Sequence, residues 1–175
     1  MNRPVTVIEP GTVKLERLLP GPIERVWAYI TESDKRAKWL AAGEFDLRVG
    51  GKITLEFNNN NLSSDKNPPP RFKDGGVGKF GGVITRLEPP RLLVHTWTWG
   101  RDDTEVTYEL TPRGKDVRLV IVHRRVPKEA GADVMSGWDV HSGVLADVLN
   151  GIEPRPFWTE IARVETQYAA APEKR

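Results

Sequence analysis

The sequence contains no cysteine, so it can form no disulfide and can supply neither a thiolate zinc ligand nor a cysteine nucleophile. No stretch approaches the ~20 apolar residues that span a bilayer, and residues 1–10 lack the basic flank and apolar run of a signal peptide. We therefore expect a soluble, cytoplasmic protein that does not insert into a membrane.

An excess of charge of one sign is also missing. The 26 Lys and Arg residues are balanced by 24 Asp and Glu residues, which leaves a net charge of +2. Nucleic-acid-binding domains concentrate basic residues on one face. The composition therefore excludes nucleic acid as the expected partner.

The length of 175 residues fits one domain, since domains average roughly 150 residues. We predict a single domain over 1–175, with a core at about 12–152 and a helical C-terminal extension at 153–175. A domain of this size can bury a core without disulfides or metal ions.

The first part of the chain alternates between strand and helix patterns. Residues 12–18 show the period of two that is typical of a half-buried strand, and residues 22–30 place apolar side chains at helical spacing. Ser33 is a favourable N-cap for a second short helix over 34–42. The pattern therefore predicts one strand followed by two short helices.

The next residues predict a β-hairpin over 44–57, with its turn at Gly50 and Gly51. Residues 58–76 combine Asn, Ser, Pro and Gly with almost no apolar side chain. We interpret them as a long solvated loop between strands rather than as a recognition segment.

The second half predicts four more strands, followed by the longest helix. Alternating patterns mark the strands at 77–89, 91–99, 104–110 and 116–126. An apolar stripe then runs along a helix at 131–152. Such a pattern indicates an α+β fold, in which a curved antiparallel sheet of six or seven strands surrounds that helix.

One motif is associated with a different function, the binding of a phosphate group. Gly76, Gly78 and Gly81 have the spacing G-x-G-x-x-G, which binds a phosphate when it follows a strand and opens a helix. Here the glycines precede a strand that ends near Pro89, and no helix pattern begins beside them. We therefore interpret them as sites where a strand bends.

Several segments together resemble a known family. The segments "AKWL", "VGGKITLEF", "GGVITRLEPPRLLVHTWTW", "VRLVIVHRRV" and "GWDVHSGVLADVLNG" are similar, in order and spacing, to the AHSA-like branch (homologues of an activator of heat-shock chaperone ATPase) of the START, or SRPBCC, polyketide-cyclase superfamily. The resemblance runs over roughly residues 12–152.

The resemblance implies a helix-grip fold, with a seven-stranded antiparallel sheet and a cavity between the sheet and the C-terminal helix. Related proteins hold lipids, sterols or polyketides there, and other branch members act as chaperone cofactors. Ser142 stands where the branch usually has leucine, which either enlarges the cavity or only lowers its packing. The asparagine- and tryptophan-rich motif of the chaperone-stimulating domains has no counterpart, and Asn58–Asn61 do not replace it.

Three histidines are the only side chains that ordinarily titrate near neutral pH. His95 and His123 lie on strand faces with apolar residues, and His141 lies on the apolar stripe of the long helix. Each is interpreted as a hydrogen-bonded core residue, as a polar anchor for a ligand or as a general acid or base. No compact ligand spacing predicts a metal site, and we expect no cofactor.

The sequence thus predicts non-catalytic binding of a small hydrophobic or amphipathic ligand. Two alternatives remain: a chaperone cofactor or interaction module, which could include a homodimer, and a cyclase- or isomerase-like enzyme that uses a cavity histidine. The predicted ligand-binding residues share an inward position on a strand or on the long helix: Phe57, His95, Trp97, Tyr108, Ile121, His123, Trp138, His141, Ser142 and Leu145.

Overall fold

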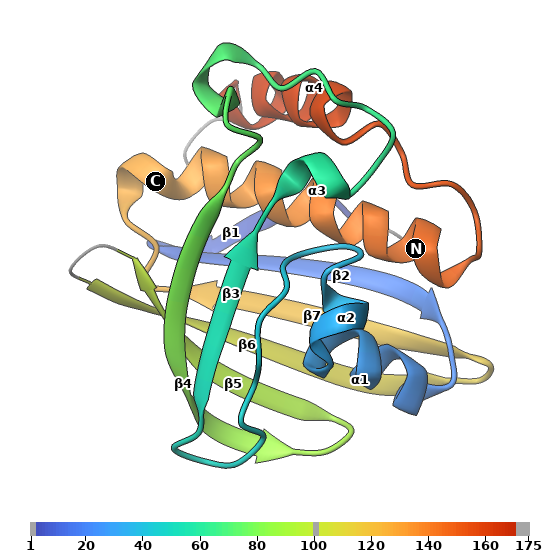
Figure 1. Cartoon of the computed structure of the whole chain (residues 1–175). Helices are drawn as coiled ribbons and strands as arrows, with labels where there is room; N and C mark the ends of the chain where they lie inside the picture. The colour runs from blue at the N-terminus through green and yellow to red at the C-terminus, as the bar shows by residue number, and fades with distance from the viewer. Residues whose placement is uncertain (1–2, 100–101, 171–175) are drawn as a thin grey trace.

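The computed structural model describes residues 3–99 and 102–170. Seven strands form one antiparallel sheet in the order β1-β2-β7-β6-β5-β4-β3 (Figure 1). The strands are β1 (Thr6–Glu9), β2 (Thr12–Pro20), β3 (Lys52–Phe57), β4 (Gly78–Glu88), β5 (Leu92–Trp99), β6 (Asp102–Arg113) and β7 (Asp116–Arg124). The predicted α+β class and the seven-stranded sheet are confirmed.

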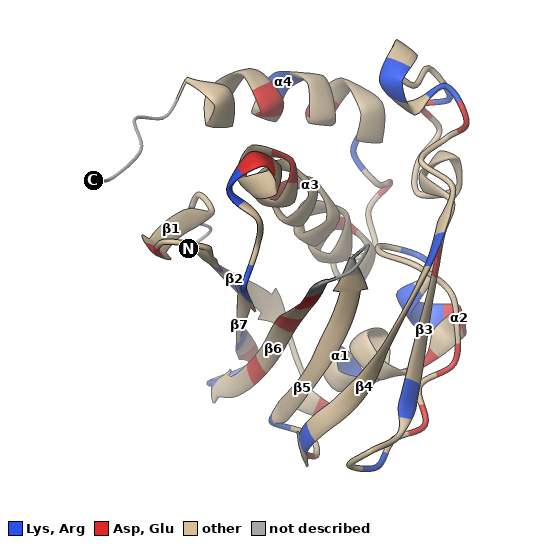
Figure 2. Ribbon diagram, turned by 90° about the vertical axis from the view of Figure 1, so that its left-hand side faces the viewer, with Lys and Arg blue, Asp and Glu red and all other residues tan. Residues whose placement is uncertain are grey.

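Four α-helices complete the fold: α1 (Ile23–Thr31), α2 (Ser33–Arg36), α3 (Gly131–Leu149) and α4 (Phe157–Ala169). The long helix α3 lies across the inner face of the curved sheet, and α4 forms a third layer on the far side of α3 (Figure 2). This arrangement is the predicted helix-grip fold, and α4 is the helix predicted in the extension 153–175, of which residues 171–175 lie outside the described residues. No helix among the described residues is long and apolar enough to cross a membrane.

The sheet differs from the prediction at both of its edges. Strand β1 was not predicted, and all four of its residues are exposed. At the other edge, the segment before β3 pairs with it only at two isolated bridges, Ala42 with Glu56 and Phe45 with Ile53. The backbone bonds from Thr54 to Glu44 and from Asp46 to Lys52 keep the same register, but the residues between Asp46 and Gly51 form turns instead of a paired strand. The predicted hairpin over 44–57 is therefore only partly formed.

The second short helix is also shorter than predicted. It ends at Arg36 instead of continuing to residue 42, and Ser33 does not cap it. The Ser33 hydroxyl instead accepts a hydrogen bond from the Gly43 backbone N–H at 2.9 Å. The chain turns here because the side chain of Arg36 binds the backbone on both sides of the turn.

Arg36 is fully buried at this turn. Its guanidinium donates to the carbonyl oxygens of Ile30 and Thr31, the last residues of α1, at 3.1 Å each. It also donates to the carbonyls of Ala41, at 3.1 Å, and Gly43. Burial lowers the pKa of Arg36 to about 10, so the group remains a cation at neutral pH. One buried charge thus joins the end of α1 to the segment that leads into β3.

The segment 58–76 is not the solvated loop that the sequence predicted. It includes two 3-10 turns and buries Leu62, and it lies along α4 (Figure 1). Ser63 accepts the N–H of Phe157 at 3.0 Å, and a carboxylate oxygen of Asp65 accepts the N–H of Thr159 at 2.9 Å. These side chains satisfy the free N–H groups at the start of α4, for which its own N-cap residue supplies no side-chain bond. The segment is therefore the N-terminal cap of a helix that lies more than 90 residues later in the sequence.

The glycine motif behaves as predicted in this fold. No helix follows it, because Gly78 and Gly81 lie within β4. At the neighbouring Gly82, an added Cβ would lie 1.8 Å from the carbonyl oxygen of Thr96. The pairing of β4 with β5 then shifts between Ile84 and Arg86. The glycines serve close approach and bending of the sheet.

Replacing Arg36 with methionine should destabilise the protein by about 3 kcal/mol or more, because four buried carbonyl oxygens lose a charged donor. The free energy of unfolding, measured by urea denaturation, checks this. Lys35→Met is the matched control, since Lys35 is only half-buried and its ion pair with Glu32 is a surface pair, whose loss should change stability little. Equal stability of the two variants would contradict the role given to Arg36.

Asp65→Ala should cost about 1 kcal/mol, as is typical for loss of a helix N-cap, and should speed amide hydrogen exchange at the start of α4. The neighbouring Ser64→Ala, at an exposed position, is the control and should leave exchange unchanged. Unaltered protection of Thr159 in Asp65→Ala would show that α4 does not depend on this cap.

Candidate functional site

The predicted binding residues lie between the inner face of the sheet and α3. Phe57 is half-buried and the other nine are buried. The strand register aligns them in rows across the sheet: Leu93, Tyr108 and Ile121 are directly opposite one another on β5, β6 and β7. His95, Val106 and His123 form the next row. Strands and helix thus bring the residues together as the alternation predicted.

His123 lies in the middle of a chain of three hydrogen bonds. The indole N–H of Trp138 donates to its Nδ1 at 3.1 Å, so Nε2 carries the proton and donates to the Thr104 hydroxyl at 2.7 Å. That hydroxyl donates to the carbonyl of Trp97 at 2.9 Å. Burial, with a smaller contribution from His95, lowers the pKa of His123 to about 3. Both nitrogens are engaged, so this imidazole is held neutral and in one tautomer.

His141 faces a different set of partners. Its Nδ1 lies 2.7 Å from the carbonyl oxygen of Trp39, to which it donates. Its ring packs 5.0 Å from that of Phe157 and 6.0 Å from that of Phe57. Burial lowers its pKa to about 4. His141 therefore joins α3 to the segment after α2 and to the start of α4.

His95 has one nitrogen without a partner. Its Nδ1 donates to the carbonyl of Thr96 at 2.7 Å, which leaves a lone pair on Nε2. Nε2 is buried, and no hydrogen-bond partner for it exists among the residues that the structure describes. The rings of Tyr108 and Phe45 each lie 5.8 Å away. Burial, reinforced by the charge of Arg36, keeps the pKa of His95 at about 4.

The remaining predicted residues fill the same layer. Trp97 stacks on His123 at 5.6 Å and on Phe57 at 5.7 Å. Ser142 is fully buried on α3, where its hydroxyl donates to the carbonyl of Asp139 at 3.0 Å. Ile121 and Leu145 are buried apolar residues. Within the described ranges, no three His, Asp or Glu side chains are arranged to hold a metal ion.

Three residues of this region escaped the sequence analysis. Thr104 links two candidate residues through its hydroxyl, and a threonine in a strand carries no signal of such a role. Phe45 and Arg36 lie beside His95, with the Arg36 guanidinium carbon 3.6 Å from the centre of the Phe45 ring. A buried charge in a short, polar helix is contrary to the usual exposure of arginine, so only the fold reveals it.

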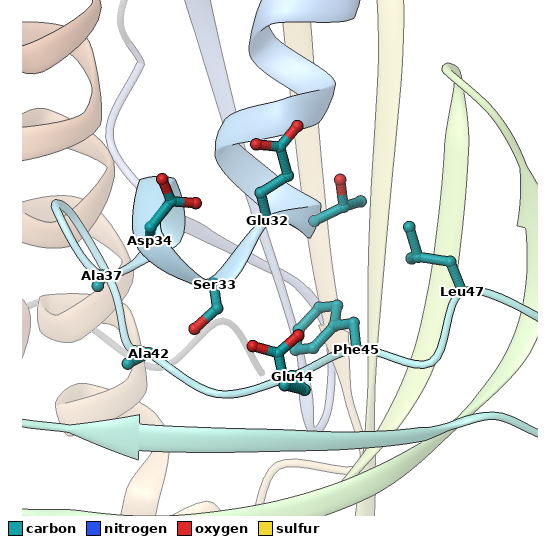
Figure 3. A pocket seen from close by; sticks show the side chains of 9 residues that line it. Glu32, Ser33, Asp34, Ala37, Ala42, Glu44, Phe45 and Leu47 are labelled. Carbon is teal, nitrogen blue, oxygen red and sulfur yellow. The ribbon is translucent and has the colours of Figure 1, made fainter.

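Two open pockets lie away from the ten predicted residues. One, of about 500 Å³, lies beside α2 (Figure 3). It is lined by Thr31, Glu32, Ser33, Asp34, Ala37, Ala42, Glu44, Phe45 and Leu47. The other, of about 310 Å³, is lined by Arg3, Glu16, Arg17, Leu18, Arg113 and Arg118. The first pocket approaches the interior, because Phe45 lines this pocket and also belongs to the buried core.

Acid should destabilise the protein through its histidines. Their folded pKa values of about 3 to 4 lie below the ordinary 6.5, so the unfolded chain binds protons first as the pH falls. The contribution of the three histidines to the free energy of unfolding is therefore fully present above pH 6.5. It is lost as the pH falls towards 4, by up to about 4 kcal/mol per pH unit for the three groups together. Urea denaturation between pH 7 and 5 measures this above the range in which carboxylates titrate. An unchanged free energy of unfolding over that interval would contradict the neutral, buried state.

Comparisons with known proteins agree with this architecture. The family model described as "Activator of Hsp90 ATPase homolog 1-like protein" matches residues 20–150. No curated protein matches the chain. Among solved structures, a protein of Bordetella parapertussis is 38% identical with a TM-score of 0.80, over 97% of this chain and 91% of that one.

Two more distant structures share the fold. CalU16 of Micromonospora echinospora is 23% identical with a TM-score of 0.68, over 96% of this chain and 92% of its own. DynU16, described as a protein of the dynemicin biosynthetic locus, is 19% identical with a TM-score of 0.65, over 82% of this chain and 49% of its own. From the family match over residues 20–150, which is most of the chain, we conclude that this chain belongs to the Activator of Hsp90 ATPase homolog 1-like family.

Proposed function

We propose that the protein binds a small, largely apolar molecule between the inner face of the sheet and α3. The observation that carries this proposal is the unpartnered Nε2 of His95. A buried acceptor without a donor costs about 1–3 kcal/mol of stability. A residue chosen for packing alone would avoid that cost, whereas a ligand donor would remove it.

The surroundings of His95 suit such a ligand. Tyr108, Trp97 and Trp138 supply aromatic surface within the same layer, and removing apolar surface from water contributes about 25 cal/mol per Å². Ligand sites commonly combine walls of this kind with a few polar groups that orient the ligand. His95 is the polar group with unused capacity.

We favour binding over cyclase- or isomerase-like catalysis. A general base needs a lone pair within reach of the substrate proton and a pKa near the working pH. His123 uses both nitrogens in the protein's own hydrogen bonds, and burial lowers the pKa of all three imidazoles well below neutrality. These groups are suited to accepting hydrogen bonds and not to taking up protons.

The description of the matched family favours a second candidate, a chaperone cofactor. One assay distinguishes the two functions. It measures the ATPase rate of the cognate Hsp90-type chaperone with and without this protein. Stimulation that persists in His95→Leu would favour the cofactor role, because a surface interaction does not need the buried imidazole.

Ser142→Leu tests the binding role. The added side chain would enter the packed layer beside α3 where we place the ligand. We expect it to weaken binding of an apolar probe such as naphthalene by at least roughly tenfold, and overpacking to cost about 1–3 kcal/mol of stability. Ser142→Ala is the control: it removes the hydroxyl without adding volume and should bind like the wild type. Titration calorimetry gives the affinities, and circular dichroism confirms folding. Equal affinities of the two variants would count against an interior site.

A further inference from the structure

The pocket beside α2 and the buried His95 are separated by one side chain. Phe45 lines the pocket, and its ring stands edge-on to the imidazole of His95 at 5.8 Å. The same ring lies beneath the guanidinium of Arg36. Moving this ring would therefore connect a surface pocket of about 500 Å³ with an unpartnered acceptor in the interior.

The position of Phe45, at the edge of the sheet and next to exposed residues, permits such a movement. Its residue pair with Ile53 is an isolated bridge and not part of a continuous strand ladder. Leu47 and Val49, which follow it, are 44% and 63% exposed. Glu44 and Asp46, on either side of Phe45, keep backbone hydrogen bonds to Thr54 and Lys52 of β3, so the movement we consider is one of the Phe45 side chain. Its ring can change rotamer while the backbone bonds to β3 stay in place.

The charges along this route select the ligand. Carboxylates of Glu32, Asp34 and Glu44 line the pocket (Figure 3). Glu32 is paired with Lys35, and the carboxylates of Asp34 and Glu44 repel anions. Farther in, the buried cation of Arg36 lies over the ring of Phe45, and this cation repels other cations. Only an uncharged molecule passes both groups without an electrostatic penalty.

The two inner groups select the chemistry further. A guanidinium above a ring site attracts an aromatic face. Four of the five N–H donors of Arg36 are already engaged by backbone carbonyls. The lone pair of His95 Nε2 accepts a hydrogen bond but offers none. A carboxylate oxygen would meet that lone pair with its own, whereas a hydroxyl would donate to it.

We propose that the pocket beside α2 is the entrance to the binding site, and that the ligand is an uncharged, hydroxyl-bearing aromatic molecule. Its ring takes the place of the Phe45 ring beneath Arg36, and its hydroxyl donates a hydrogen bond to Nε2 of His95. This inference rests on the proposed function, because it names the ligand class and the route for the same site.

The test compares 2-naphthol with 2-methoxynaphthalene, which has the same ring system but no donor. Titration calorimetry on the full chain at pH 7.5 should show the naphthol binding roughly fivefold tighter, the effect of one net hydrogen bond. In His95→Leu the two affinities should become equal. In His95→Gln, which retains a polar acceptor at this depth, part of the preference should return.

The route is tested by association kinetics. Phe45→Ala removes the ring between pocket and interior, so 2-naphthol should associate at least roughly tenfold faster by stopped-flow tryptophan fluorescence, because the opening step is no longer required. Val49→Ala is the control, since it lies on the same segment but does not line the pocket. Its association rate should match that of the wild type.

The outcomes separate the two levels of the argument. Equal wild-type affinities for the naphthol and its ether, a preference that survives in His95→Leu, or an unchanged association rate in Phe45→Ala would overturn this inference. If both probes still bind and lose affinity in Ser142→Leu, the proposed function stands without it. If neither probe binds saturably to the wild type, the inference is overturned, and absence of binding by any apolar probe would overturn the proposed function as well.

Discussion

The buried guanidinium of Arg36 is the interaction on which the arrangement of this site depends. It binds carbonyl oxygens at the end of α1 and on both sides of the turn after α2. Those bonds fix the path of the chain towards β3 and bring Phe45 against the cation. Its direct hydrogen bonds are to four backbone carbonyls, and the nearby charge of Glu44 also favours the cation. The position of the guanidinium is therefore set by the backbone of the turn.

A second set of polar contacts holds the outer layer. The hydroxyl of Tyr168 near the end of α4 donates to Asp139 of α3 at 2.6 Å and accepts the N–H of Val5 at 3.0 Å. Asp139 also pairs with the buried Arg17 of β2 at 2.6 Å. At the other end, Ser63 and Asp65 cap α4. The third layer is therefore attached at both ends through side chains of α3, β2 and the segment 58–76, and it covers the face of α3 opposite the sheet.

The sequence was sufficient to predict which side chains face the core in those strands where the spacing of apolar residues follows burial. The alternation along β5, β6 and β7 placed His95, Tyr108 and His123 correctly on the inner face, because a strand that covers a core has a strict period of two. It was insufficient where one side chain acts on distant backbone. Nothing in a polar stretch such as "SSDKN" identifies the cap of a later helix, and nothing in "SDKR" shows that its arginine is buried. Nor does composition reveal which imidazole nitrogens find partners, since that depends on contacts such as Trp138 with His123.

The central claim is that a ligand donor completes the hydrogen bonding of His95. The nitrogen chemical shifts of its imidazole, recorded by long-range ¹H–¹⁵N correlation with and without saturating 2-naphthol, test it most directly. The account predicts a proton on Nδ1 in both states, and a shift of Nε2 from that of a free lone pair towards that of a hydrogen-bonded acceptor when the naphthol binds. An Nε2 resonance that stays unchanged at saturation would contradict it.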